Sequence, residues 1–217
     1  MMDIRTAYNF WSRQYDTNEN KTRDLERIAL RAVLQDKLFE CCLEIGCGTG
    51  KNTIWLTSIS KRVLAVDFSE NMLAIAKGKI HSNNVTFLQA DITGEWQFGS
   101  NTQFDLATFS LVLEHIKNLD HVFNELKGVM KPGGFVYIGE LHPFKQYAGA
   151  KAKFETESGL TVLTCYQHNI SDFITSAAKF CHKDRRNNNN SPKTYTSPFK
   201  PPLFPKPITT SLKYCIK

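Results

Sequence analysis

The sequence predicts an α/β fold, a doubly wound and mostly parallel sheet with helices on both faces. Three observations support this prediction. First, apolar and β-branched runs alternate with amphipathic segments along residues 41–141. Second, several of these runs are apolar at consecutive positions, as in strands that are buried on both faces. Third, a glycine-rich turn joins the first run to the helix that follows it. At 217 residues, the chain is long enough for one such domain with a substantial core.

Two helices are expected before the sheet. The first lies within residues 3–20 and carries four aromatic residues among polar ones, Tyr8, Phe10, Trp11 and Tyr15. The second runs from Thr22 to about residue 38, where apolar residues recur at helical spacing. The apolar face of this second helix is expected to pack against the sheet.

A glycine-rich turn follows the first strand. Gly46, Gly48 and Gly50 stand at every second position, and Glu44 lies two residues before the first of them. A turn without side chains lets backbone N–H groups approach a ligand, and the helix that follows, from Asn52 to about residue 60, points its positive end at the same place. The pattern predicts a bound polar ligand; a turn that binds nothing is the alternative.

The spacing of these glycines separates two ligand classes. A dinucleotide fingerprint, G-x-G-x-x-G, would place its third glycine at position 51, which is Lys51. Glu44 also suits a ligand with an ammonium group better than one dominated by a pyrophosphate. A nicotinamide oxidoreductase is therefore disfavoured, since only similarity of fold supports it.

The alternation of strand and helix continues after the turn. Ser69 can cap a helix that extends to about residue 79, and the K-P-G-G motif at residues 131–134 is expected to stop the helix of residues 118–130. A hairpin around Gly159 and a helix over residues 171–180 follow. The predicted strands after the first cover residues 62–66, 85–90, 104–109 and 135–141, and the hairpin strands cover 154–156 and 160–166.

The pattern changes from residue 181 onward. Residues 187–190 are four asparagines, six of the eight prolines fall after position 190, and only residues 208–216 could form a strand. Nine of the 27 lysines and arginines lie from Lys179 onward, but only one of the 21 acidic residues does. The positive net charge, formally +6 for the whole chain, therefore comes from the tail. This segment is predicted to be largely disordered and altered from the usual fold.

The predicted domain division has two parts, a folded domain over residues 1–180 and a basic, Pro/Asn-rich tail over residues 181–217. Within the folded domain, the N-terminal helices occupy residues 1–40, the core of the binding site residues 41–142, and the hairpin with the last helix residues 143–180.

Composition narrows the class of protein. No run approaches the ~18 apolar residues of a membrane helix, and the first ten residues lack a signal-peptide core, so a cytoplasmic location is expected. The cysteines form no C-x-x-C pair and have no histidine at metal spacing, so buried, reduced thiols are expected instead of disulfides or zinc: Cys41, Cys42, Cys47, Cys165, Cys181 and Cys215.

Four sequence blocks point together to one family. They are E-x-G-x-G-x-G at residues 44–50, V-D-F-S at 66–69, Q-A-D-I at 89–92 and K-P-G-G at 131–134. In this order they resemble the class I S-adenosylmethionine (SAM) dependent methyltransferases, most closely the small-molecule "type 11" branch, and H-N-I-S-D-F at 168–173 is similar to that branch as well. The resemblance implies a Rossmann-like sheet, SAM as the cofactor and S-adenosylhomocysteine as its product. It also implies two final strands, of which the sequence shows at most one.

Polar residues accumulate where the predicted strands end, which is the edge where open α/β sheets bind ligands. The resemblance implies that Asp67 accepts hydrogen bonds from both ribose hydroxyls and that Asp91 accepts one from the adenine amino group, with a turn-forming role as the alternative for Asp91. Trp11 and Tyr15 either line the methionine end of the cofactor or pack in the core. The full cofactor-binding set is Glu44, Gly46, Cys47, Gly48, Gly50, Asp67, Phe68, Met72, Asp91, Ile92, Ser110, Leu111 and Tyr15.

The implied reaction is an in-line attack of an O, N, S or C nucleophile on the sulfonium methyl group. His115 and His142 stand where a general base could act, and an imidazole titrates near neutral pH. Packing for His115 and a turn for His142 are the alternatives, and His168 is a weaker candidate. Glu114 and Glu140 could bind a cationic substrate, although solvated carboxylates are favoured.

The expected partner is a small-molecule methyl acceptor, without a specific nucleic acid or a membrane. Lys183, Arg185 and Arg186 lack interleaved aromatics, so a solvated tail is favoured over a nucleic-acid site. A sheet edge left uncovered by missing strands would favour a homodimer. A SAM-binding protein without turnover is the alternative function, because the altered C-terminal segment could leave the substrate side incomplete.

Overall fold

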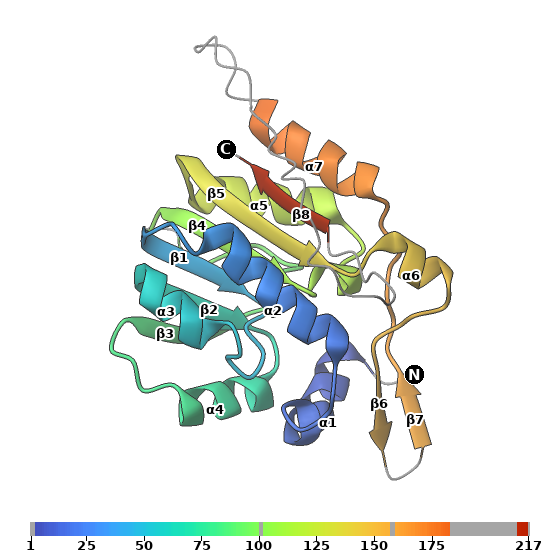
Figure 1. Ribbon diagram of the computed structural model, residues 1–217. Helices are drawn as coiled ribbons and strands as arrows, with labels where there is room; N and C mark the ends of the chain where they lie inside the picture. Colours follow the sequence, from blue (N-terminus) through green and yellow to red (C-terminus); the bar gives the residue numbers. More distant parts are fainter. Residues whose placement is uncertain (1–2, 100–101, 157–158, 183–211, 217) are drawn as a thin grey trace.

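The computed structural model describes residues 3–99, 102–156, 159–182 and 212–216 (Figure 1). Its main sheet has six strands in the order β3-β2-β1-β4-β5-β8, in which neighbours from β3 to β5 pair in parallel and β8 pairs antiparallel with β5. The predicted mostly parallel sheet is confirmed. The strands are β1 (Phe39–Ile45), β2 (Ser60–Asp67), β3 (Val85–Gln89), β4 (Phe104–Ser110), β5 (Met130–Glu140) and β8 (Leu212–Ile216), and a hairpin pairs β6 (Lys153–Thr156) with β7 (Gly159–Val162).

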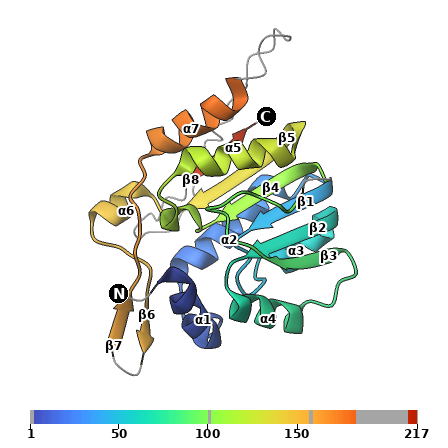
Figure 2. The same ribbon diagram turned by 180° about the vertical axis from the view of Figure 1, so that it is seen from behind.

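Helices cover both faces of this sheet (Figures 1 and 2). Leu30 of α2 and Leu56 of α3 belong to the apolar cluster on one face, and Val122 of α5 and Phe173 of α7 belong to the cluster on the other. The helices are α1 (Ile4–Tyr15), α2 (Lys21–Leu34), α3 (Thr53–Ile59), α4 (Glu70–Lys79), α5 (Leu119–Val129), α6 (Pro143–Tyr147) and α7 (Ile170–His182), with a short 3-10 turn at Leu113–His115.

Strand β1 shows why the central strands are apolar at successive positions. Leu43 and Ile45 pack in one cluster, while Cys42 packs in the cluster on the opposite face. Successive side chains of a strand point to opposite faces, so both faces of β1 are buried. The cysteines of this strand therefore serve as small apolar side chains, as the sequence predicts.

The order of the strands reverses at β1, which pairs with β2 on one side and β4 on the other. Ile45, the last residue of β1, stands opposite Val66 and Phe109 in the two registers. The carboxyl ends of β1, β2 and β4 thus meet at one edge of the sheet. This is the switch point at which ligands bind in open α/β sheets.

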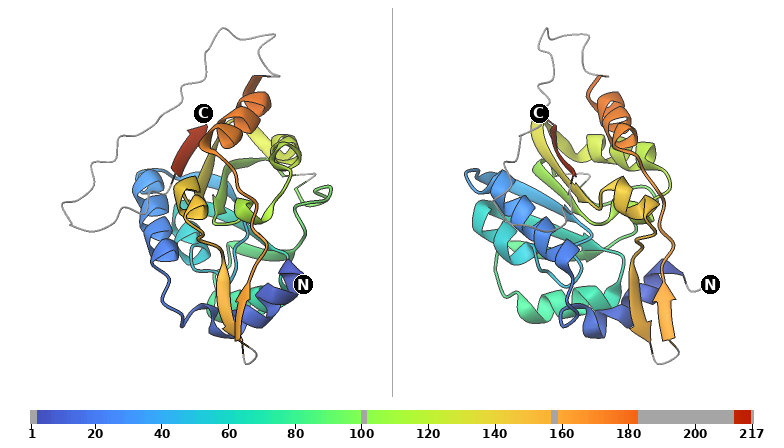
Figure 3. Two further views of the ribbon diagram at one scale, coloured as in Figure 1. Left: turned by 90° about the vertical axis from the view of Figure 1, so that its right-hand side faces the viewer. Right: turned by 45° about the vertical axis from the view of Figure 1, so that its right-hand side comes forward.

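Helix α1 and the β6–β7 hairpin lie together at that edge (Figure 3). A third apolar cluster joins them, with Ala7 and Trp11 from α1, Phe154 from β6, and Leu163 directly after β7. The rings of Trp11 and Phe154 stack at 5.2 Å between centroids. This small cluster is separate from the two clusters on the faces of the sheet.

Two elements differ from the sequence prediction. The K-P-G-G residues 131–134 lie within β5, where they form an irregularity: Met130 pairs with Phe104, and the register then shifts so that Phe135 pairs with Leu106. The irregularity lets two glycines and a proline sit inside a strand. Helix α6 was not predicted, because a helix of only five residues leaves no periodic pattern.

Strand β8 falls within the stretch of residues 208–216 that the sequence proposes as a strand. Because β8 pairs with β5, the uncovered edge on which the expected homodimer rests is occupied. The other residues of the predicted tail, apart from Cys181 and His182 at the end of α7, lie outside the described part of the chain.

Candidate functional site

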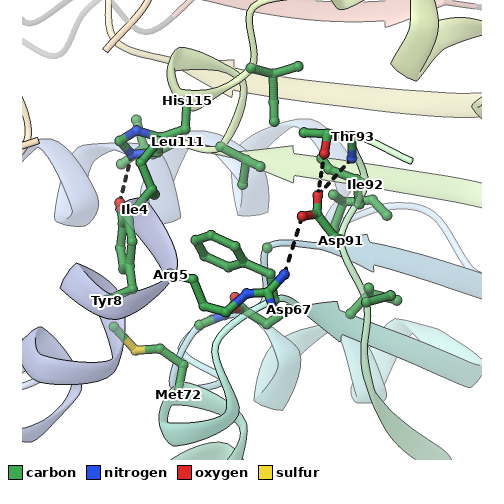
Figure 4. Close-up of a pocket in the computed structure, with 18 of the residues that line it drawn as sticks. Ile4, Arg5, Tyr8, Asp67, Met72, Asp91, Ile92, Thr93, Leu111 and His115 are labelled. Carbon is green, nitrogen blue, oxygen red and sulfur yellow. Dashed lines mark hydrogen bonds and ion pairs between the residues drawn. The ribbon is translucent and has the colours of Figure 1, made fainter. Parts of the chain in front are cut away.

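A cavity of about 810 Å³ opens at the carboxyl edge of the sheet beneath α1. Its lining comes from α1, the glycine turn, the ends of β2 and β4, the residues after β3, and the segment after β7 (Figure 4). Tyr8 and His115 lie on one side of it, and Arg5, Asp91 and Thr93 lie on another. The volume is in the range of cavities that bind small ligands.

The glycine turn exposes its backbone to this cavity. Gly46 and Gly48 have φ angles of 69° and 54°, which favour glycine. A Cβ at Gly46 would lie 2.2 Å from Val112, so this position accepts no side chain. A Cβ at Gly48 would approach only Tyr15, at 4.0 Å, so the backbone there faces open space that a ligand can enter.

Asp67 ends β2 beside the turn. Its carboxylate accepts hydrogen bonds from the N–H groups of Gly48 and Ser69, both at 2.8 Å. The side chain is buried, and burial raises the pKa of its carboxyl group although the two N–H donors act in the opposite direction. The carboxylate thus joins the glycine turn to the start of α4 and faces the cavity with acceptor capacity to spare.

Asp91 is held by two neighbours at the far side of the cavity. The N–H and hydroxyl groups of Thr93 donate to its Oδ1 at 2.9 and 2.7 Å, and Arg5 of α1 forms an ion pair with Oδ2 at 3.3 Å. Partial burial acts to raise the pKa of Asp91, but these donors and the Arg5 charge hold it below its usual value. The turn-forming role considered for Asp91 is therefore present, and the residue also lines the cavity.

The structure gathers most of the predicted cofactor set around the cavity: Tyr15, Gly46, Gly48, Asp67, Phe68, Met72, Asp91, Ile92, Ser110 and Leu111. Leu111 has a φ of 58°, a left-handed conformation that is rare for leucine, and its N–H donates to the carbonyl of Gly139 at 2.7 Å. Ser110 donates to the buried carboxylate of Glu26 at 2.7 Å. Backbone strain and buried hydrogen bonds thus fix the end of β4.

Three members of the predicted set, Glu44, Cys47 and Gly50, do not line the cavity. Glu44 is buried beneath the turn, where the Thr53 hydroxyl donates to its Oε2 at 2.6 Å. Burial raises its pKa to about 8. Cys47 packs into an apolar cluster, and a Cβ at Gly50 would lie 2.5 Å from Ile80, so both serve the packing of the turn.

The two candidate bases have different positions. His115 lines the cavity, and its Nε2 lies 2.8 Å from the Tyr8 hydroxyl. His142 does not line the cavity. It precedes α6, and its Nδ1 accepts a hydrogen bond from the N–H of Phe144 at 3.1 Å, which is the turn role considered as the alternative. His168, whose Nε2 lies 2.7 Å from the Ile116 carbonyl, is also outside the lining.

The expectation that Glu114 and Glu140 are solvated is wrong, because both are buried. The Oε1 atom of Glu140 accepts hydrogen bonds from the N–H groups of Val112 and Leu113, each at 2.8 Å. Burial raises the pKa of Glu140 to about 8. Glu140, the last residue of β5, thus holds the loop after β4 in place through these two hydrogen bonds. Neither Glu114 nor Glu140 lines the cavity.

Tyr8 and Arg5 are among the lining residues that sequence reasoning did not assign to the site. Tyr8 stands seven positions before Tyr15, so both fall on one face of a helix, and this spacing could have indicated it. No sequence pattern indicates Arg5, because its partner Asp91 is 86 residues away. Only the packing of α1 against the rest of the domain brings the two residues together.

Within the described ranges, no group of three or more His, Cys, Asp or Glu residues could hold a metal ion. Those same ranges contain no helix long and apolar enough to cross a membrane.

Comparisons with known proteins agree with this architecture. Residues 43–138 match the family described as "Methyltransferase domain". A demethylmenaquinone methyltransferase of Leptospira interrogans is 39% identical over 98 residues, which span 42% of this chain and 39% of that protein. One of Lactococcus lactis is 33% identical over 152 residues, 64% of this chain and 59% of that protein. The chain thus matches less than two thirds of these relatives' length.

Solved structures share the fold. A DhpI complex with S-adenosylhomocysteine has a TM-score of 0.65 and 20% identity, over 80% of this chain and 83% of that one. A putative SAM-dependent methyltransferase of Listeria monocytogenes has a TM-score of 0.67 and 20% identity, over 91% and 97% of the two chains. Residues 43–138 of this chain thus match a methyltransferase domain, and the chain has the fold of the SAM-dependent methyltransferases named here.

Proposed function

We propose that the chain binds SAM in the cavity at the edge of the sheet and transfers its methyl group to a small-molecule acceptor. The observation that carries this proposal is the convergence of Gly46, Gly48 and the Asp67 carboxylate on one cavity of about 810 Å³. Open backbone at Gly48 and a neighbouring carboxylate with free acceptor capacity suit a ribose and an amino-acid end better than a pyrophosphate.

The described residues fit SAM along the length of the cavity. Asp67 would accept from the ribose hydroxyls, and the backbone at Ile92, with Asp91 beside it, would hold the adenine. The strained turn at Leu111 would meet the methionine end. Glu44 would act indirectly, because its hydrogen bond to Thr53 fixes the first residue of α3 behind the glycine turn.

When bound, SAM supplies a methyl group on a positively charged sulfur, and the protein contributes alignment and, where needed, a base. His115 is the base that we favour, because its imidazole lines the cavity on the side away from Asp91. His142 lies outside the lining, so the proposal assigns it no chemical role.

The acceptor is proposed to be a small organic molecule. The relatives named above act on demethylmenaquinone by their names, and another similar fold is titled the N-methyltransferase NodS from Bradyrhizobium japonicum, with a TM-score of 0.53 and 20% identity over 65% of this chain and 81% of that one. The first name gives a small molecule, demethylmenaquinone, as the acceptor, and the second gives nitrogen as the methylated atom.

Calorimetric titration with SAM and, separately, with NADH tests the cofactor. We expect micromolar binding of SAM alone, and at least tenfold weaker binding for Asp67→Ala, because the ribose hydroxyls lose a charged acceptor. Glu70→Ala removes an exposed acid three residues away and should bind SAM as the wild type does. Failure of the folded protein to bind SAM would refute the proposal, and binding without methyl transfer to any acceptor would favour a non-catalytic SAM-binding protein.

A further inference from the structure

The hydrogen bonds of His115 fix which of its ring nitrogens carries the proton. Its Nδ1 lies 3.1 Å from the carbonyl oxygen of Thr164. A carbonyl can only accept, so Nδ1 must donate, and in the neutral ring Nε2 is then the atom with a free lone pair. The Tyr8 hydroxyl, 2.8 Å from Nε2, is therefore the donor to this lone pair.

Tyr8 and His115 both line the cavity, and the Tyr8 hydroxyl lies against the Nε2 atom of His115. The His115 side chain is only 9% exposed, and the ring of Tyr8 meets the imidazole edge-on at 5.4 Å between centroids. Burial, reinforced by the negative groups around it, raises the pKa of Tyr8 well above its usual value, so the phenol keeps its proton. The free lone pair of His115 Nε2 thus accepts the Tyr8 proton in a hydrogen bond, and the Tyr8 oxygen can still accept a hydrogen bond from another group.

Glu114 supplies the charge that a protonated His115 would need. Its Oε1 lies 3.9 Å from Nε2, and its side chain is 11% exposed. Its other oxygen, Oε2, is buried and has no hydrogen-bond partner among the described residues. A carboxylate at this distance attracts the positive charge that the ring gains when it takes a proton.

We infer that Tyr8, His115 and Glu114 form a proton relay, in which the Tyr8 hydroxyl takes the proton of the methyl acceptor and passes its own to His115. This inference rests on the proposed methyl transfer. The acceptor O–H bond breaks as its proton moves to the Tyr8 oxygen, and the Tyr8 proton moves to Nε2. The acceptor oxygen forms a bond to the methyl carbon while the carbon–sulfur bond breaks and its electron pair stays on sulfur.

The relay also defines the class of acceptor. A neutral imidazole can take the proton of a phenol or an enol far more easily than that of an aliphatic alcohol, whose conjugate base is much stronger. Aromatic side chains of Tyr8 and Tyr166 line the same cavity and offer faces for a planar ring. The assigned acceptor is therefore a phenolic or enolic hydroxyl compound.

The relay is tested by nitrogen NMR of histidine-labelled protein saturated with S-adenosylhomocysteine, with His115→Asn to assign the signals. We expect neutral His115 to carry its proton on Nδ1, and the Nε2 signal to move by several ppm toward that of a free imine nitrogen in Tyr8→Phe. Tyr147→Phe removes an exposed hydroxyl outside the cavity and should leave the Nε2 signal in place. A proton on Nε2, or the same Nε2 signal in Tyr8→Phe as in the wild type, would overturn the relay.

Methyl transfer from labelled SAM tests the acceptor class with three phenols, catechol, hydroquinone and 1-naphthol, and one amine, benzylamine. We expect transfer to a phenol, with a rate about 100-fold lower in Tyr8→Phe and unchanged affinity for SAM. Glu114→Gln should lower the rate and retain the Nδ1 proton. Methylation of the amine alone, or of none of the probes by protein that binds SAM, would overturn the acceptor class. Absence of SAM binding would instead refute the proposed function.

Discussion

Glu44 is a buried acid whose carboxyl pKa burial raises to about 8, against a usual value near 4.5. Between these two pH values the folded protein holds a proton that the unfolded chain has released, so ionisation of the unfolded chain draws the equilibrium away from the fold. The contribution of Glu44 to stability must therefore fall as pH rises through this window. Glu44→Gln keeps an acceptor for Thr53 and cannot ionise.

We expect the stability of Glu44→Gln relative to the wild type to increase from pH 5 to pH 8, by at most about 1.4 kcal/mol per pH unit. Urea unfolding at several pH values measures this difference. Glu40→Gln changes an exposed glutamate of the same strand and should follow the wild-type profile. A Glu44→Gln curve parallel to that of the wild type would show that the buried carboxyl does not titrate in this range.

At the residue scale, sequence reasoning succeeds where a residue is defined by its neighbours in the chain. Gly46 and Asp67 carry their roles in local motifs, and both lie at the cavity. Glu44 matches its motif equally well but lies beneath the turn, because burial depends on how α3 packs. Arg5 could not be assigned, since its partner is 86 residues away. Only the helical spacing of Tyr8 from Tyr15 could indicate Tyr8, since its partner His115 is 107 residues away.

Helix α1 is the element that covers the cavity, and polar contacts hold it to the start of α4. The Oδ1 atom of Asn9 accepts from the Ser69 hydroxyl at 2.6 Å, and the Asn9 carbonyl accepts from the Asn71 side chain at 3.1 Å. Ser69 in turn caps α4, accepting from the N–H of Met72. The Ser69 hydroxyl thus links α1, which covers the cavity, to the first turn of α4.

We expect Asn9→Ala to cost about 1 kcal/mol in the docking of α1, because the Ser69 hydroxyl loses its acceptor. Amide hydrogen exchange should accelerate roughly fivefold in α1, with little change in β1. Arg13→Ala alters an exposed residue of the same helix and serves as the matched control. Faster exchange throughout the sheet would mean that α1 does not open separately.

At the scale of elements, the strands and long helices could be predicted because each carries its own periodic pattern. Ser69 caps its helix as the sequence indicates. The failures are short or interrupted elements. Helix α6 is too short for periodicity, and the glycines of residues 131–134 mark an irregularity inside β5 where the sequence suggests a stop.

The cavity of the molecule lies between two parts that have separate apolar clusters. The sheet and its covering helices contain two large apolar clusters, whereas α1 and the hairpin share a small third one around Trp11 and Phe154. The mostly parallel sheet could be expected from the alternating pattern. The contact between α1 and the hairpin could not, because these elements lie near opposite ends of the folded domain in the sequence.

Trp11→Ala tests whether the cover of the site can open without loss of the sheet. Trp11 is 6% exposed and stacks on Phe154, so removing it should cost about 3–5 kcal/mol in the third cluster. We expect affinity for S-adenosylhomocysteine to fall more than tenfold while the main thermal transition shifts by only a few degrees. Leu43→Ala, in the centre of the sheet, should lower the main transition strongly, and Phe10→Ala, at a position 55% exposed, should change neither property. If Trp11→Ala lowered the main transition as much as Leu43→Ala, the cover and the sheet would unfold as one cooperative unit.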